Sequence, residues 1–124
     1  MAEISAARED YLEAILTLSE TRGYARSVEV AERLGVSRAS VSRAIGKLKE
    51  LGYVEAGRYA SLTLTPAGVA AAQTVRDRHS ALKAFLVNTL GVEEAIAEVD
   101  ACRMEHCVSR ETLERIKALT EHSR

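Results

Sequence analysis

The apolar positions of this 124-residue chain recur three and four residues apart over most of its length, which is the spacing of amphipathic helices. This spacing predicts a first helix over residues 4–20, with the inward positions Ile4, Tyr11, Ile15 and Leu18. It also predicts a short second helix over 27–34 and a third helix from the N-cap Ser37 to about Leu51. The turn 35–37 between them makes a helix-turn-helix pattern. The side chains expected to pack these two helices together are Val28, Ala31, Leu34, Val36, Val41, Ile45 and Leu48.

After residue 52 the pattern changes to two short strand-like runs and then returns to helices. Residues 53–55 and 61–64 predict a β-hairpin around the loop 56–60. Thr65-Pro66 is a typical helix start, and the helix that follows is expected to run to about Leu90. Two shorter helices are expected near 93–107 and 110–122, the latter with Ser109 as its N-cap. The sequence therefore predicts a mainly α protein, with a winged helix-turn-helix domain over 1–70 and an all-helical domain over 71–124.

The net charge of −1 conceals an uneven distribution along the chain. Residues 1–21 carry a net charge of −4, residues 22–60 carry +4, and residues 61–124 carry −1. A basic segment that coincides with a helix-turn-helix and its hairpin favours double-stranded DNA as a partner. The alternative is a helical hairpin whose basic side chains only form a solvated face. The residues expected to contact DNA are Arg26, Ser37, Arg38, Ala39, Ser40, Ser42, Arg43, Lys47, Arg58 and Tyr59.

Within this set, position predicts the kind of contact. Arg43, on the outward face of the third helix, can reach guanine edges in the major groove. Arg38, Ser40 and Lys47 suit phosphates, and Arg58 at the hairpin tip suits the DNA backbone or minor groove, with Tyr59 beside it.

Other features narrow the class of protein. The two cysteines, Cys102 and Cys107, are too close to form a disulfide framework and suit a reducing cytoplasm. Neither a membrane-spanning apolar run nor a signal-peptide pattern at the N-terminus is found. The sequence contains no nucleophile-elbow motif, no Gly-rich phosphate loop and no H-E-x-x-H helix, so an enzyme with a small-molecule substrate is not expected.

Six side chains on three predicted helices form a candidate divalent-metal site. Cys102, Glu105 and His106 are spaced i, i+3 and i+4, and therefore share one helix face. Asp10 and Glu13 form a second one-face pair on the first helix. Sulfur, carboxylate and imidazole ligands together suit a transition metal. The sixth candidate is His79, midway along the long helix, whereas Cys107 and His122 are not expected to bind.

Each of these groups also has an ordinary structural interpretation. Asp10 and Glu13 could be acids that interact with the helix dipole. His79 could belong to a solvated charged face, and Cys102 could be a small core side chain. The metal interpretation depends on their joint presence.

The sequence resembles the diphtheria-toxin-repressor and manganese-transport-regulator family over nearly its whole length. The segments that carry the resemblance are Glu9–Ile15, Val30–Val41, Leu64–Gly68, Arg78-His79 and Cys102–His106. The resemblance implies a homodimeric repressor that binds a palindromic operator when loaded with Fe(II) or Mn(II). It also implies that Asp10, Glu13, His79, Cys102, Glu105 and His106 are metal ligands, and that the helices after the wing dimerise.

The resemblance gives a mixed indication of the metal. A cysteine at position 102 is typical of the iron branch, where the manganese branch has Glu, whereas an acid at position 10 is typical of the manganese branch. Lys83 stands where the iron branch has an acid of its ancillary site, which argues against a second ion there. The chain ends at Arg124, so we expect the two-domain manganese type. Mn(II) is slightly favoured over Fe(II), while Zn(II) or Co(II) are expected to bind in vitro.

The apolar surface of the C-terminal half exceeds what three short helices bury alone, which predicts a homodimer. The residues expected at its interface are Leu82, Phe85, Leu86, Leu90, Ile96, Val99, Leu113, Ile116 and Leu119. A purely intramolecular core is the alternative. For the function, the alternative is a metal-free winged-helix regulator that senses a small ligand or oxidation of Cys102, and a metalloenzyme is a third hypothesis.

Overall fold

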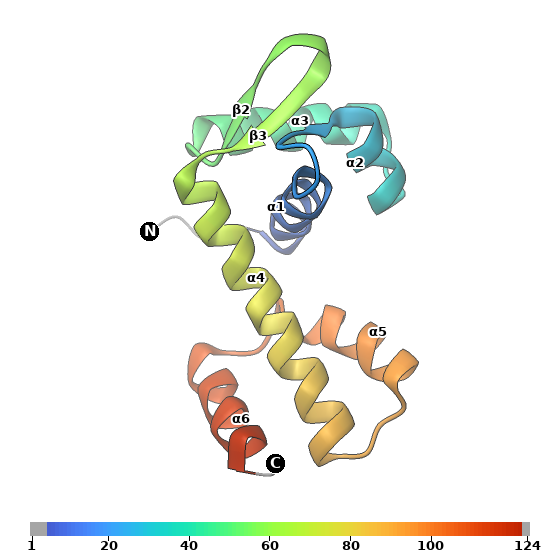
Figure 1. Cartoon of the computed structure of the whole chain (residues 1–124), viewed down its shortest axis with the longest axis vertical. Helices are drawn as coiled ribbons and strands as arrows, with labels where there is room; N and C mark the ends of the chain where they lie inside the picture. Colours follow the sequence, from blue (N-terminus) through green and yellow to red (C-terminus); the bar gives the residue numbers. More distant parts are fainter. Residues whose placement is uncertain (1–4, 123–124) are drawn as a thin grey trace. The chain divides into compact units, whose positions relative to one another are not determined.

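The computed structural model describes residues 5–122 as two compact units, one ending at Thr74 and the other beginning at Val75 (Figure 1). The first unit contains α1 (Ala6–Ser19), β1 (Ala25–Arg26), α2 (Ser27–Leu34), α3 (Arg38–Glu50), β2 (Val54–Ala56), the 3-10 turn η1 (Arg58–Ala60) and β3 (Ser61–Leu64). The helix α4 (Pro66–Ala84) begins in the first unit and ends in the second. The second unit continues with the π-helical turn η2 (Phe85–Thr89), α5 (Glu94–Met104) and α6 (Arg110–His122). A mainly α fold with a winged helix-turn-helix and a helical domain is confirmed.

Local capping explains where the helices of the first unit begin and end. The Ser37 hydroxyl accepts a hydrogen bond from the Ser40 backbone N–H at 3.1 Å, as its predicted N-cap role requires. Gly35 ends α2 in the left-handed conformation at φ 66°. Ser5 caps α1 through the backbone N–H of Arg8 at 3.3 Å. Ile4, predicted at the start of the first helix, lies outside the described residues.

The inward face of α2 differs from the prediction in one respect. Val28 is 38 % exposed and Val36, in the turn, is 37 % exposed, so both were wrongly assigned to the core. Val30 is fully buried in their place, next to Ala31. The reason is that Val30 and Leu34 lie four residues apart on one helix face, whereas Val28 lies on the side that faces the wing.

A three-stranded antiparallel sheet in the order β1-β3-β2 completes the first unit. The predicted hairpin is confirmed, with Val54 opposite Leu64 and Ala56 opposite Leu62. The two-residue strand β1, which pairs with β3, was not predicted from the sequence. At the hairpin tip Tyr59 and Ala60 both have left-handed backbone, at φ 58° and 57°.

The core of the first unit is apolar throughout. It is built from α1, the helix-turn-helix, the sheet and the first part of α4. Its buried residues are Tyr11, Leu12, Ile15, Ala25, Val30, Ala31, Val41, Ile45, Leu48, Val54, Leu62 and Ala72. This core holds the helix-turn-helix and the wing on one scaffold.

Backbone contacts hold the end of the wing to the start of α4. The Thr65 backbone N–H donates to the Tyr53 carbonyl at 3.0 Å, and its hydroxyl donates to the Gly52 carbonyl at 2.7 Å. The same hydroxyl accepts from the Gly68 N–H at 3.1 Å, which confirms Thr65 as the N-cap. A Cβ at Gly68 would lie 2.0 Å from the Tyr53 carbonyl oxygen, so only glycine fits there.

The second unit has a smaller core. Leu82, Leu86, Ala97, Ala101 and Leu113 are buried together. Leu82, Leu86 and Leu113 were predicted at a dimer interface, but they fill this intramolecular core. The large apolar side chains of the described part of this unit that stay exposed are Leu90, Ile96, Val99 and Leu119, each at least half exposed. The long helix, predicted to be regular up to Leu90, changes to π geometry at Phe85.

Candidate metal centre and nucleic-acid interface

The exposed face of α3 and the tip of the wing carry the predicted DNA contacts. Of the ten residues expected to contact DNA, Ser40 is half-buried. The remaining predicted side chains are exposed: Arg26, Ser37, Arg38, Ala39, Ser42, Arg43, Lys47, Arg58 and Tyr59. The hydroxyl groups of Ser37 and Ser40 lie 3.0 Å apart and take part in capping α3, so their first role is structural.

A hollow of about 600 Å³ lies between α3 and the wing. Three basic residues, Arg26, Arg38 and Lys49, line it together with Tyr59 of the wing tip. Gly46 is also at its wall, and nothing lies within 4 Å of the position that a Cβ would take there. Lys49 was not predicted to contact DNA, although its place seven residues after Ser42 puts both on one face of α3.

Two guanidinium groups flank the ring of Tyr24 at the edge of the sheet. Arg22 lies 4.6 Å and Arg26 5.8 Å from the ring centroid, and the Arg26 Nη2 donates to the Tyr24 hydroxyl oxygen at 3.5 Å. The hydrogen bond and positive charge of Arg26 lower the pKa of Tyr24 below its ordinary value. Arg22 also forms an ion pair with Glu29. The contacts with Tyr24 thus hold Arg26, which also lines the hollow.

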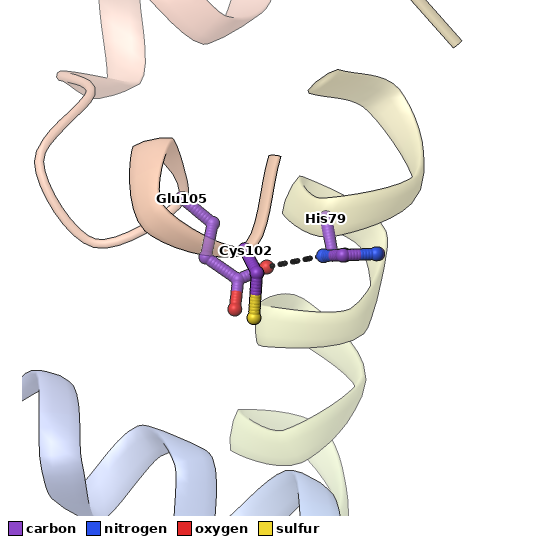
Figure 2. A group of neighbouring side chains, drawn as sticks. All are labelled: His79, Cys102 and Glu105. Atoms are coloured by element: carbon purple, nitrogen blue, oxygen red, sulfur yellow. Dashed lines mark hydrogen bonds and ion pairs between the residues drawn. The ribbon is translucent and has the colours of Figure 1, made fainter. Parts of the chain in front are cut away.

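Three predicted metal ligands meet in the second unit (Figure 2). His79 projects from α4, Cys102 from the last turn of α5, and Glu105 is the C-cap residue of α5. One nitrogen, one sulfur and one carboxylate oxygen from these residues all lie within 4.8 Å of one another. The i, i+3 spacing of Cys102 and Glu105 places both on the side of α5 that faces His79.

Burial makes this cluster unlike an ordinary surface group. The side chain of Glu105 is fully buried and that of His79 is 17 % exposed. The Nδ1 of His79 lies 3.1 Å from the Glu105 Oε2, and the Nε2 of His106 lies 3.4 Å from the Glu105 Oε1. Burying a carboxylate is costly unless positive charge or donors compensate for it. Glu105 is therefore a strong candidate for a cation ligand, with His106 beside it.

Two ordinary interpretations of these residues are wrong. Cys102 is exposed, so it is not a core side chain, and its neighbour Ala101 is buried in its place. His79 does not belong to a solvated face, because both of its ring nitrogens face carboxylates. Cys107 is exposed, and its Sγ is within hydrogen-bonding distance of the Arg103 and Met104 carbonyls. The side chain of His122 lies outside the described residues.

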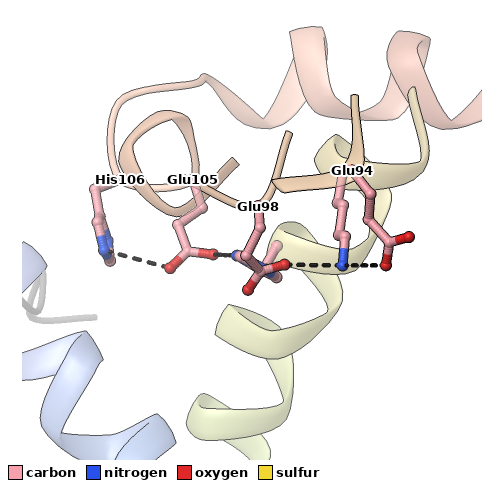
Figure 3. A network of polar contacts seen from close by, with 6 residues as sticks. Glu94, Glu98, Glu105 and His106 are labelled. Carbon is pink, nitrogen blue, oxygen red and sulfur yellow. Dashed lines mark hydrogen bonds and ion pairs between the residues drawn. The ribbon is translucent and has the colours of Figure 1, made fainter. Parts of the chain in front are cut away.

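Glu98, which was not predicted from the sequence, links the cluster to Lys83 (Figure 3). Its Oε1 lies 3.0 Å from the Nε2 of His79, and its Oε2 lies 3.0 Å from the Nζ of Lys83. The hydrogen bond from Lys83 lowers the pKa of Glu98 most, and the hydrogen bond with His79 lowers it further. The hydrogen bond between Lys83 and Glu98 in turn raises the pKa of Lys83. The i−4 spacing of Glu98 from Cys102 is the sequence signal that could have identified it.

The side chains of this cluster fit a divalent transition metal. Imidazole nitrogen suits Fe, Co and Zn, and a thiolate favours softer ions, whereas carboxylates also suit Mn(II). Three different donor types converge here, and one of them is a buried carboxylate. The second unit therefore supplies a mixed nitrogen, sulfur and oxygen ligand set.

Asp10 and Glu13 lie on α1 in the first unit, and both are half-buried. The helix begins at Ala6, so both lie beyond its first turn, where Glu9 is the acid closest to the helix dipole. Their participation in the metal site stays a prediction.

Family models match both parts of the chain. Residues 3–62 match the iron dependent repressor N-terminal DNA binding domain, and residues 65–124 match the iron dependent repressor metal binding and dimerisation domain.

In the described part of the chain, no helix is both long and apolar enough to cross a membrane.

Individual proteins support the same relationship. The chain is 39 % identical over 119 residues to an uncharacterised HTH-type transcriptional regulator of Methanocaldococcus jannaschii, covering 95 % of each. It is 42 % identical over 113 residues to the transcriptional regulator MntR of Salmonella typhimurium, covering 91 % of this chain and 71 % of the relative. A solved manganese-dependent transcriptional repressor in complex with manganese superposes with a TM-score of 0.84 at 36 % identity, covering 92 % of this chain and 52 % of the other.

The chain thus spans most of these two relatives and about half the length of the solved manganese-dependent repressor. The family consists of transcriptional repressors and not of enzymes. The chain belongs to the iron-dependent repressor family, the diphtheria-toxin-repressor and manganese-transport-regulator group of metal-dependent transcriptional regulators.

Proposed function

We propose that this protein is a cytoplasmic repressor that binds a palindromic operator as a homodimer when it is loaded with Mn(II) or Fe(II). The observation that carries the proposal is the convergence of His79, Cys102 and Glu105 within 4.8 Å, in the part of the chain that matches a metal-binding and dimerisation domain. Its DNA-binding domain would span residues 1–70 and its metal-binding domain residues 71–124.

The metal ligands in this proposal come from both domains. His79, Cys102, Glu105 and His106 belong to the second domain, and Asp10 and Glu13 extend the set from α1. A bound divalent cation would supply the positive charge that these carboxylates lack. The buried side chain of Glu105 supports this role most directly, because a buried carboxylate gains most from a cation.

The ligand types favour different ions. Carboxylates from Asp10, Glu13 and Glu105 suit Mn(II), and the relatives named for manganese point the same way. The thiol of Cys102 suits Fe(II), Co(II) or Zn(II) better. Raw affinity follows the general order of divalent metals and would favour Zn(II) over Mn(II), so selectivity has to come from the geometry of the site.

DNA recognition in this proposal uses the exposed face of α3 and the wing. Arg43 would read guanine edges in the major groove, and Arg38 and Lys47 would bind phosphates. Arg58 and Tyr59 would contact the backbone or minor groove at the wing tip. Pairing of two copies through the exposed Leu90, Ile96, Val99 and Leu119 would present two such surfaces to successive major grooves.

The regulatory step is a coupling of the two binding events. Without the ion, Asp10, Glu13 and Glu105 repel one another, and the first domain, which carries α1, is not fixed to the second. With the ion, α1 is tied to the ligands of the second domain, which fixes the spacing of the two DNA-reading surfaces in the dimer. Ion and operator then strengthen each other's binding, by about 1–3 kcal/mol.

The test measures operator binding by fluorescence anisotropy under anaerobic Mn(II), Fe(II) and Zn(II) in parallel. Glu105→Ala and His106→Ala should each abolish the metal dependence, whereas Glu111→Ala, an exposed acid on α6, should leave it unchanged. Unchanged metal dependence in Glu105→Ala contradicts the ligand assignment. Operator binding that persists in the wild type after chelation contradicts metal control, and would instead support the metal-free regulator.

A further inference from the structure

The geometry points to Glu98 as a positioning residue that orients the imidazole ring of His79 for metal binding, with Lys83 holding Glu98 in place. This inference rests on the proposed role of His79 as a metal ligand. It adds a residue outside the group of converging ligands, and it assigns a function to the Glu98–Lys83 ion pair.

The two nitrogens of His79 face two different carboxylates of α5. Nδ1 lies 3.1 Å from Glu105, on the side where Cys102 also lies, and Nε2 lies 3.0 Å from Glu98 (Figures 2 and 3). Glu98 and Glu105 are seven residues apart, two turns of one helix, so α5 places one carboxylate against each ring nitrogen.

This arrangement determines which nitrogen can bind an ion. A neutral imidazole carries its proton on one nitrogen and offers a lone pair on the other. Nδ1 is the ring nitrogen on the side of Cys102 and Glu105. It must therefore be unprotonated when it binds a metal ion together with them. The proton then belongs on Nε2, where the Oε1 of Glu98 accepts it. Carboxylates that accept the second ring N–H of a metal-bound histidine fix both its tautomer and its orientation.

Lys83 explains why Glu98 acts on His79 and not as a direct ligand. One oxygen of Glu98 faces the His79 Nε2, and the other lies 3.0 Å from the Lys83 Nζ. Lys83 also reaches Glu94 at 3.4 Å, which gives the ammonium group a second contact. Both oxygens of Glu98 are therefore engaged on the far side of the imidazole ring from Cys102.

The experiment separates the hydrogen bond from the charge. Glu98→Ala/Lys83→Met and Glu98→Gln/Lys83→Met both keep the wild-type net charge, because each loses one acid and one base. Only the glutamine variant keeps an oxygen that can accept from His79, and without Lys83 that oxygen serves His79 alone. Glu114→Ala, an exposed acid on α6, controls for the loss of an unrelated acid.

Two measurements are made on each full-length variant. The first is the tautomer of His79 in the metal-free protein, from its ring ¹⁵N shifts, after raising the pH until these shifts stop changing. The second is the affinity for Mn(II) by anaerobic equilibrium dialysis. Because the Glu105 carboxylate faces Nδ1 and competes for the proton, we expect the Nε2–H tautomer to be a larger fraction in the wild type and in the glutamine variant than in the alanine variant. We expect the alanine variant to bind Mn(II) about tenfold more weakly than the glutamine variant.

The same fraction of the Nε2–H tautomer and the same Mn(II) affinity in both double variants would overturn the positioning role of Glu98. Equal losses of affinity in both would also overturn it, because the hydrogen bond would then not matter. His79→Ala separates this inference from the proposed function. If His79→Ala leaves Mn(II) binding intact, the ligand assignment fails, and if it abolishes binding while the two double variants match the wild type, only the inference fails.

Discussion

The core of the first unit and the core of the second differ in what they bury. Twelve apolar residues fill the first core, and no charged side chain is buried in it within the described part of the chain. The second unit has five buried apolar residues in its core and, in addition, a fully buried Glu105 in contact with two histidines. The first unit can thus obtain its stability from apolar burial alone, whereas the second contains a carboxylate whose free energy depends on nearby positive charge. The apolar packing of the first core should not depend on the ion, even though the proposed ligands Asp10 and Glu13 lie on its helix α1, whereas the buried Glu105 of the second unit should respond to the ion.

The largest expected effect tests the first half of this comparison. Leu48 on α3 is fully buried, so Leu48→Ala should lower the free energy of unfolding by about 2–5 kcal/mol through lost burial and a cavity. The loss should be the same with and without Mn(II), as measured by urea denaturation followed by circular dichroism. A loss that saturating Mn(II) restores would contradict the independence of this core.

The next effect tests the second half. Mn(II) at a hundred times its dissociation constant should stabilise the wild-type protein by about 2.7 kcal/mol. Glu105→Gln keeps the shape of the side chain but removes its charge, so this stabilisation should disappear. Thermal unfolding with and without Mn(II) measures it, with Glu111→Gln as the control. Full Mn(II) stabilisation in Glu105→Gln would show that the buried carboxylate is not what responds to the ion.

A pair of helix caps allows a direct comparison of the two units. Ser37 and Ser109 accept hydrogen bonds from the backbone N–H groups of Ser40 and Thr112 at 3.1 and 3.2 Å. Replacing either serine by alanine should cost about 1 kcal/mol of stability. Ser37→Ala should also weaken operator binding, and Ser109→Ala should not, which anisotropy titrations of both variants can measure. Equal weakening by both would indicate that capping acts only through general stability.

The smallest effect is a shift in a titration within the first unit. The Arg26 guanidinium lowers the pKa of Tyr24, so Arg26→Met should raise that pKa towards its ordinary value. The sign follows because a neighbouring positive charge stabilises the phenolate, and removing it favours the protonated phenol. The phenolate absorbance measures the change, with Tyr24→Phe identifying the signal. Because Tyr24 is not among the proposed metal ligands, Mn(II) should not alter the titration.

The helices of the DNA-binding unit could be predicted closely because their signals are local. Ser37, Gly35 and Thr65 each mark a helix boundary by their own backbone chemistry, and the structure has the boundaries there. Val28 was assigned inward because helical periodicity alone does not tell which face of an eight-residue helix meets the core. The strand β1 was missed because two residues have no period, and its pairing with β3 depends on contacts distant in sequence.

The candidate metal centre shows the same division. Cys102 and Glu105 could be found because their spacing on one helix is a local property. Glu98 was overlooked because its function depends on His79 and Lys83, which lie on another helix, and only the packing of α5 against α4 reveals it. The π-helical turn after Ala84 was also beyond prediction, since its residues are ordinary helix formers and the change depends on tertiary packing.

The wing tip has a consequence for the thermodynamics of association. Tyr59 and Ala60 hold a left-handed backbone that costs a residue with a side chain about 1–2 kcal/mol, and Tyr59 is 89 % exposed. Glycine at these positions would remove that cost, but it would allow the loop many more backbone conformations in solution. With tyrosine and alanine the loop has few accessible backbone conformations. It therefore loses little conformational entropy when a macromolecule docks against the tip, because the loop is already ordered in the folded protein.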